Sequence, residues 1–175
     1  RVRRSRLVDE IIVATTDKPQ DDAIVKLCDQ NEIKIFRGSE DNVLDRVSCC
    51  LAGYKGWGHV ELVGDAPYVD PQIIDEFIGY FLKHLDTVDY VSNGMEITYP
   101  NGAEVNVYMV DTLVECNKRI NSNDPMREHV DINIYRSGLY KCVNLEAPLY
   151  LNHPELYIEI DTEKDYQVLK IIGDY

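Results

Sequence analysis

Short runs rich in β-branched residues alternate with segments of helical periodicity along most of the chain. The runs EIIVATT, IKIFRG, HVELVGD and VDYVSN occupy residues 10–16, 33–38, 59–65 and 88–93. In the segments between them, at about 20–31, 41–54 and 71–85, apolar residues recur every three or four positions. Strands that alternate with crossover helices build a largely parallel sheet covered by helices. The sequence therefore predicts an α/β fold.

The second half of the chain departs from this alternation. Residues 97–110, ITYPNGAEVNVYMV, carry a turn signal between two alternating runs, which predicts a hairpin or another small β-excursion. We expect helices from Asp111, from Asp124 and from Thr162, and late strands at 140–146 and 156–160. Pro71 and Pro125, each preceded by an aspartate that can cap free N–H groups, mark strong helix starts.

Length, charge and cysteine content narrow the class of protein. The 175 residues are enough for one domain, and because the first is Arg1 we interpret the sequence as the inside of a longer chain. A net charge of -13 repels polyanions and excludes an extended nucleic-acid interface, and no apolar run is long enough for a membrane span. Five scattered cysteines in no C-x-x-C pair predict reduced thiols and a cytoplasmic protein rather than a zinc or disulfide framework.

Two aspartates end apolar strands of the predicted sheet. Asp65 follows the run at 59–63, with Gly64 allowing close backbone approach and Pro67 stopping the strand, and Asp161 follows LYIEI. Either could be only a turn residue or a helix cap. Ligands of open α/β sheets collect at the carboxyl ends of the strands, however, and two carboxylates there can share one Mg²⁺. Handling of nucleotide phosphates is the chemistry that this arrangement favours.

Several motifs occur in the order found in one enzyme family. They read FRGSEDNVLDR, VGDAPYVDPQIIDE, DYVSN, YPNGAEVNVY, REHV and IDTEKDYQVLKII. Over nearly its whole length the chain resembles the cytidylyltransferases of the spore coat polysaccharide F-protein type, relatives of the CMP-sugar-acid synthetases. The resemblance implies a Rossmann-like, GT-A-like nucleotidyltransferase fold, a three-layer sandwich around a mostly parallel sheet. It also implies transfer of CMP from CTP to a sugar or sugar-acid acceptor with release of pyrophosphate, dependence on Mg²⁺, and pairing into a homodimer.

The same resemblance assigns roles to individual residues. It makes Asp65 and Asp161 the catalytic, metal-binding pair. Nucleotide-binding positions would be Gly38, Ser39, Asp45, Arg46 and Gly64. Positions near the acceptor would be Glu104, Asn106, Arg127, Glu128 and His129. Local patterns leave simpler interpretations open, since residues 39–42 could be only a helix cap and residues 127–129 only an exposed first turn.

The chain also departs from the family pattern. Where the family has P-x-G-x-D-x-E, this chain has PNGAEVN, so Glu104 replaces an aspartate and Asn106 replaces a glutamate. The loss of an acidic group predicts a difference in acceptor choice. The family's opening strand and the loop that cradles the triphosphate should precede Arg1. We therefore expect residues 1–175 to be a single nucleotidyltransferase domain, incomplete at its N-terminus. The rival interpretations are a sugar-nucleotide-dependent glycosyltransferase, which usually shows a D-x-D pair that is absent around Asp65, and a truncated non-catalytic binding domain.

Overall fold

The structure is a computed structural model that describes residues 1–54 and 56–174. The chain divides into two compact units, each built from separate segments. Unit 1 comprises Arg1–Val8, Val60–Val107 and Cys142–Tyr175, and unit 2 comprises Asp9–His59 and Tyr108–Lys141. Strands β3 (Gly58–Glu61) and β5 (Asn106–Met109) pass from one unit to the other. The assignment of one domain to residues 1–175 stays a prediction.

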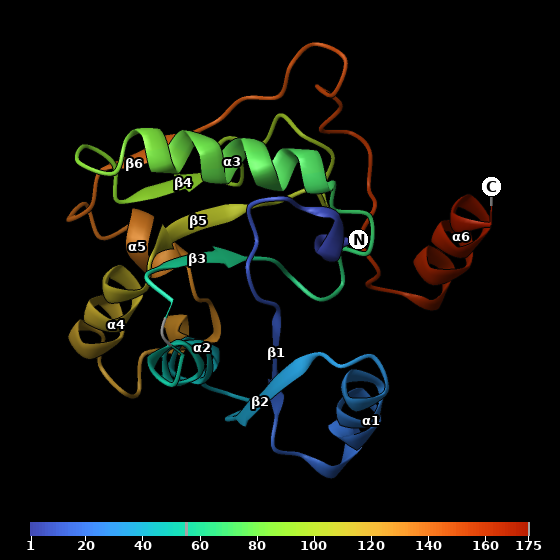
Figure 1. Ribbon diagram of the computed structural model, residues 1–175, viewed down its shortest axis with the longest axis horizontal. Helices are drawn as coiled ribbons and strands as arrows, with labels where there is room; N and C mark the ends of the chain where they lie inside the picture. The colour runs from blue at the N-terminus through green and yellow to red at the C-terminus, as the bar shows by residue number, and fades with distance from the viewer. Residues whose placement is uncertain (55, 175) are drawn as a thin grey trace. The chain divides into compact units, whose positions relative to one another are not determined.

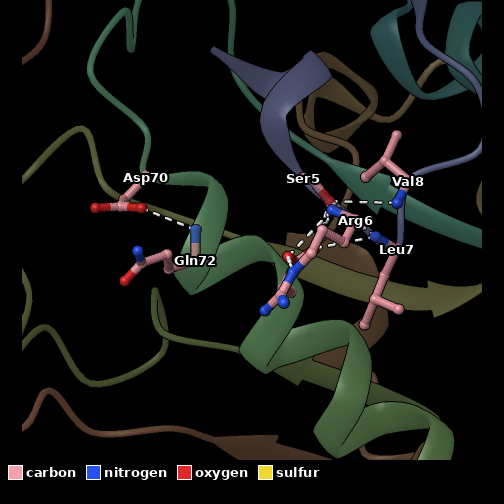
Figure 2. Close-up of polar contacts among 7 residues, drawn as sticks. Ser5, Arg6, Leu7, Val8, Asp70 and Gln72 are labelled. Atoms are coloured by element: carbon pink, nitrogen blue, oxygen red, sulfur yellow. Dashed lines mark hydrogen bonds and ion pairs between the residues drawn. The ribbon is translucent and has the colours of Figure 1, made fainter.

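Helix α3 (Pro71–Lys83) provides much of the core of unit 1. The Asp70 side chain accepts a hydrogen bond of 2.8 Å from the Gln72 N–H, and Pro71 occupies the first turn, as predicted (Figure 2). The helix lies along strand β4 (Tyr90–Ser92) in Figure 1. Its fully buried Phe77 meets the Tyr99 ring edge-on, with 6.2 Å between the ring centroids. The buried residues of α3 recur every three or four positions, which is why the sequence pattern located the helix; they are Ile73, Ile74, Phe77, Ile78 and Phe81.

Four short strands form one sheet in the order β3-β5-β4-β6. Strand β6 (Cys142–Asn144) pairs with β4 in parallel, with Tyr90 opposite Cys142 and Ser92 opposite Asn144. All three residues of β4 are buried. The strands predicted at 59–65, 88–93 and 140–146 are therefore present, although each is shorter than predicted.

Unit 2 contains a second, two-stranded parallel sheet. Strands β1 (Ile12–Thr16) and β2 (Lys34–Gly38) are joined by the 3-10 turn η2 (Pro19–Asp21) and helix α1 (Asp22–Gln30), the predicted crossover unit. The core of the unit includes Leu44 of α2 (Val43–Ala52), Leu113 of α4 (Val110–Arg119) and Ile134 of α5 (Ile132–Tyr135), all fully buried. The helix predicted to start at Asp124 is confirmed only as one 3-10 turn, η3 (Pro125–Glu128).

Two strand predictions are wrong. Residues 97–105 contain no strand in the described structure, so the segment 97–110 forms no hairpin and contributes only β5. Residues 156–160 also form no regular strand, and what remains is a single parallel bridge between Asn101 and Tyr157. Both segments have alternating or apolar character, but neither finds a partner strand over enough residues to build a ladder.

Main-chain hydrogen bonds tie the 156–160 segment to two remote loops of unit 1. The N–H of Asn101 donates to the carbonyl of Leu156 at 3.0 Å, the N–H of Ile158 donates to the carbonyl of Asn101 at 2.9 Å, and the N–H of Ile160 donates to the carbonyl of Asp65 at 2.9 Å. Gly102 makes the close approach: its φ is +95°, and an added Cβ would lie 2.7 Å from the Glu159 Cγ. We call this set of contacts the three-segment tie.

After the three-segment tie the chain enters its last helix, α6 (Glu163–Gly173). Thr162 and Asp165 form a reciprocal capping box at its start, which agrees with the helix predicted from Thr162. In the described part of the chain no helix combines the length and the apolar character that a bilayer crossing requires.

A carboxylate of α3 holds the N-terminal segment of unit 1. Asp75 accepts hydrogen bonds from the Ser5 hydroxyl at 2.5 Å, the Arg6 N–H at 3.0 Å and the Leu7 N–H at 3.1 Å, contacts drawn in Figure 2. The partial burial of Asp75 works to raise its pKa, but these hydrogen bonds outweigh it and lower the pKa below the ordinary 3.8. The ionised form of Asp75 is therefore the one that the fold stabilises.

We predict that Asp75→Asn lowers the free energy of unfolding by about 1 to 3 kcal/mol at neutral pH, because the hydrogen bonds from residues 5–7 lose their charged acceptor. Since the folded pKa is depressed, this stabilisation is fully present above the unfolded pKa and is lost as the pH falls through the folded value. Urea unfolding at several pH values measures it, with Asp86→Asn, an exposed site in the same unit, as the charge control. Equal losses of unfolding free energy in the two variants would show that the hydrogen bonds to Asp75 do not stabilise the fold.

We predict that Gly102→Ala costs about 2 kcal/mol or more, because positive φ strains alanine and its Cβ would collide with the backbone of residue 158 at 2.9 Å. Gly79→Ala is the matched control: it lies inside α3, and its added Cβ would meet no described atom within 4 Å. There alanine should stabilise the protein by up to about 1 kcal/mol. Thermal unfolding of both variants gives the comparison, and similar shifts would show that the three-segment tie does not need glycine.

Candidate active site

The first predicted aspartate lies beyond the end of its strand. β3 ends at Glu61, and Asp65 stands in the following loop with an exposed side chain. The carbonyl of Asp65 accepts the N–H of Ile160, the residue directly before Asp161. Residues 65 and 160 are therefore adjacent in space although 94 positions of sequence lie between them. The Asp161 side chain is also exposed, so neither carboxylate is turned into the core.

Tyr157 orients the second aspartate. Its hydroxyl donates a hydrogen bond to Oδ2 of Asp161, and this bond raises the pKa of Tyr157 because loss of the phenolic proton would put two negative charges together. The other carboxylate oxygen of Asp161, Oδ1, takes no part in this hydrogen bond. The placement does not depend on a regular strand, because the three-segment tie holds residues 156–160 in its absence.

Glu159 is a candidate residue that the sequence analysis did not identify. Its burial raises its pKa, and the negative charges of Glu104, Asp65 and Asp161 add to that shift, while a hydrogen bond with Tyr157 opposes it. Carboxylates from three separate segments thus interact electrostatically within unit 1. No motif contains Glu159, so only the packing of the segments could have revealed it.

The donors available here fit a hard divalent cation. Carboxylate oxygens are the ligands that Mg²⁺ prefers, and Mg²⁺ in nucleotide enzymes is commonly bound by one or two carboxylates, with waters and substrate phosphates as the other ligands. Among the described residues, no group of three or more His, Cys, Asp or Glu side chains is assembled as a metal site. The arrangement around Asp65 and Asp161 therefore fits a cation whose coordination the substrate completes.

The remaining predicted positions of unit 1 differ in how accessible they are. Gly64 is exposed, and a Cβ added there would meet no described atom within 4 Å, so its backbone is open to a ligand. Glu104 is half-buried, and its Oε2 accepts the N–H of Gly102 at 2.7 Å. Asn106 is 8% exposed, and its Oδ1 accepts the hydroxyls of Tyr90 at 3.0 Å and Ser92 at 2.6 Å. The Asn106 oxygen is thus used inside the core.

In unit 2 the predicted nucleotide positions lie in one continuous stretch, from the last residue of β2 to the first turn of α2. Gly38 ends β2, and a Cβ added there would come within 3.0 Å of the Arg46 Cγ. The Ser39 carbonyl accepts a hydrogen bond of 2.7 Å from Nη1 of Arg46. Among the described residues no hydrogen-bond partner reaches the buried Nε of Arg46. This guanidinium therefore still has a donor to offer beside the turn.

The three predicted acceptor-side residues in and directly after η3 differ in their exposure. Glu128 and His129 are exposed, as an exposed-turn interpretation requires, whereas Arg127 is only 7% exposed. The Arg127 guanidinium hydrogen-bonds the side chain of Asn42 and both the side chain and the backbone of Asn117. Its donors point into unit 2, toward protein acceptors.

Comparisons with known proteins show which family this chain resembles. The family model described as cytidylyltransferase matches residues 1–171. The protein MJ1063 of Methanocaldococcus jannaschii is 38% identical over 96% of this chain and 67% of its own length. The spore coat polysaccharide biosynthesis protein SpsF of Bacillus subtilis is 31% identical over 98% of this chain and 72% of its own length.

Two solved structures share the fold. A cytidylyltransferase from Leptospira borgpetersenii serovar Hardjo-bovis superposes with a TM-score of 0.88 at 23% identity and covers 100% of this chain and 73% of its own. The CMP:2-keto-3-deoxy-manno-octonic acid synthetase complexed with CTP has a TM-score of 0.66 at 13% identity, over 99% of this chain and 84% of its own. The predicted Rossmann-like α/β fold is thereby confirmed. The extent of the family match and the identity to SpsF show that this chain belongs to the cytidylyltransferase family of nucleotidyltransferases.

Proposed function

We propose that this protein transfers CMP from CTP to a sugar or sugar-acid acceptor, with release of pyrophosphate, during assembly of polysaccharide or glycan precursors. Family membership supports the transfer of a cytidylyl group, and the polysaccharide setting is carried over from the printed name of SpsF. The observation that supports the proposal is the hydrogen bond from the Ile160 N–H to the Asp65 carbonyl, because it makes the backbone of Asp65 a neighbour of the residue directly before Asp161.

In this proposal Asp65 and Asp161 hold Mg²⁺, with the Tyr157 hydroxyl fixing the orientation of Asp161. The bound cation supplies neutralisation of phosphate charge. Glu159 adds negative charge to the same region and so favours occupancy by a cation. The cation held by these carboxylates would offset part of the repulsion between a triphosphate and a chain with a net charge of -13.

The reaction proposed is an in-line displacement. An oxygen of the acceptor hydroxyl forms a bond to the α-phosphorus of CTP, the bond from that phosphorus to the bridging oxygen breaks, and pyrophosphate leaves. The hydroxyl proton passes to solvent. Reactions of this kind depend mainly on positioning and on charge stabilisation, so a dedicated general base is not required.

The other predicted residues have supporting roles in the proposal. From the family resemblance we carry over Gly38, Ser39, Asp45, Arg46 and Gly64 as nucleotide-binding residues. From the same resemblance we carry over Glu104, Glu128 and His129 as acceptor-binding residues. Asn106 and Arg127 would act only indirectly, because their polar atoms are engaged inside the protein. The five free thiols support a cytoplasmic location, and the homodimer rests on the family resemblance alone.

We predict that Asp65→Asn and Asp161→Asn each lower kcat by about a hundredfold or more, since each removes charge stabilisation at the reacting phosphate. Release of pyrophosphate from CTP, with a panel of sugars and sugar acids and with Mg²⁺ present or chelated, measures turnover. Asp70→Asn is the matched control, because it removes the same charge from unit 1 while asparagine still caps α3. Its turnover should equal that of the unmodified protein.

The same assay separates the rival functions. Turnover with a preformed sugar nucleotide and none with CTP would indicate a glycosyltransferase. Binding of CTP without any pyrophosphate release, for every acceptor in the panel, would indicate a non-catalytic binding protein. Unchanged turnover in Asp65→Asn would remove the metal role of that residue.

A further inference from the structure

Arg127 is a buried cation whose partners are almost all neutral. Its Nε donates to Oδ1 of Asn42 at 3.0 Å, its Nη1 donates to the carbonyls of Ile120 at 3.0 Å and Asn117 at 3.3 Å, and its Nη2 donates to Oδ1 of Asn117. Its contact with Asp45 is looser, at 3.9 Å, and the Asp45 side chain is 46% exposed. A buried guanidinium that binds amide and carbonyl oxygens from several elements joins those elements in a fixed geometry.

One of these bonds reaches the cap of α2. Oδ1 of Asn42, the N-cap residue, accepts both the Asp45 N–H at 3.1 Å and the Arg127 Nε–H at 3.0 Å. The Asn42 N–H in turn donates to the Ser39 hydroxyl at 3.1 Å, and Arg46 closes the same turn through the Ser39 carbonyl. Arg127 therefore fixes the side chain of Asn42, and the hydrogen bonds of Asn42 hold the conformation of residues 39–46.

A second route from Arg127 reaches Asp45. Because Oδ1 of Asn117 accepts from Arg127, the amide of Asn117 is oriented with its Nδ2 outward, and Nδ2 donates to Oδ1 of Asp45 at 3.1 Å. Arg127 thus fixes the position of two groups of Asp45. It acts on the backbone N–H through Asn42 and on the carboxylate through Asn117. Both routes end in the turn between β2 and α2, and all of these residues belong to unit 2.

We infer that Arg127 is a positioning residue that holds residues 38–46 in the conformation that binds the nucleotide. The inference rests on the proposed function, which places CTP against this segment. Lysine cannot replace arginine in this role, since an ammonium group is a point donor and cannot reach acceptors on α2 and α4 in one plane. Arg127 acts on CTP through Asn42 and Asn117 and does not itself touch the substrate.

The test compares Arg127→Lys and Asn42→Ser with Asn133→Ala. Serine still caps a helix, but its hydroxyl lies too close to its own backbone to replace the long amide reach to Arg127. Asn133 is the control because its Nδ2 holds the same η3 turn, through the Met126 carbonyl at 2.9 Å and the His129 carbonyl at 3.0 Å, without a described contact to α2. Calorimetry of CTP binding with Mg²⁺ present, steady-state kinetics and thermal unfolding are measured on each full-length variant.

We expect Arg127→Lys and Asn42→Ser to raise the Kd and the KM for CTP about tenfold or more, with the KM of the acceptor unchanged, because misplacement of a binding segment weakens only the ligand that it holds. Hydrogen exchange of the Asp45 amide should accelerate in both. Asn133→Ala should leave CTP affinity within about twofold at a similar loss of stability.

CTP affinity in Arg127→Lys and Asn42→Ser equal to that of the unmodified protein, or no weaker than in Asn133→Ala, would overturn the positioning role while leaving the proposed function in place. Failure of the unmodified protein to bind CTP would overturn both. If Arg127→Lys does not fold, Asn42→Ser alone decides between these results.

Discussion

Main-chain pairing between segments far apart in sequence is the constraint on which the candidate site depends. The bonds among residues 101, 156 and 158 and the bond between residues 65 and 160 form without a regular strand. They need an approach so close that Gly102 adopts a φ of +95°. Because backbone atoms make these contacts, the placement of Asp65 beside residue 160 does not rely on flexible side chains. Charged groups can then gather at the surface without having to hold the fold together.

The two units use different means to fix their polar groups. In unit 1 backbone hydrogen bonds fix the segments and carboxylates lie around them, and burial together with repulsion from these carboxylates raises the pKa of Glu159. In unit 2 a buried guanidinium and two amide side chains, those of Asn42 and Asn117, pin the turn that follows β2. A network of this kind is costly to break, since removal of one member leaves buried acceptors unpaired. Each arrangement would give a bound nucleotide a preorganised surface.

The elements that the sequence located correctly are those whose signals are local. Asp70 and Pro71 begin α3, whose apolar spacing runs from Ile73 to Phe81, and Thr162 and Asp165 cap α6. The predicted hairpin at 97–110 and the predicted strand at 156–160 are wrong because a strand exists only where a partner ladder forms. Such a ladder depends on residues elsewhere in the chain. The one-turn η3 carries the same Asp-Pro signal as α3, but the backbone becomes extended at His129 and ends the turn there.

The candidate site likewise has some residues that local sequence signals identified and others that only the packing of remote segments revealed. Asp65 and Asp161 could be selected from the sequence because each follows an apolar run, and the ordered motifs were sufficient to predict the family. The part played by Glu159 and the burial of Arg127 could not be predicted, because the one depends on charges from remote segments and the other on packing against α2 and α4. Sequence by itself determined the helices with local capping signals and the family, and it singled out Asp65 and Asp161 as candidates. Only the tertiary structure decided which charges share one environment and which are buried, because burial and Coulomb interaction depend on distances between segments that the chain order does not specify.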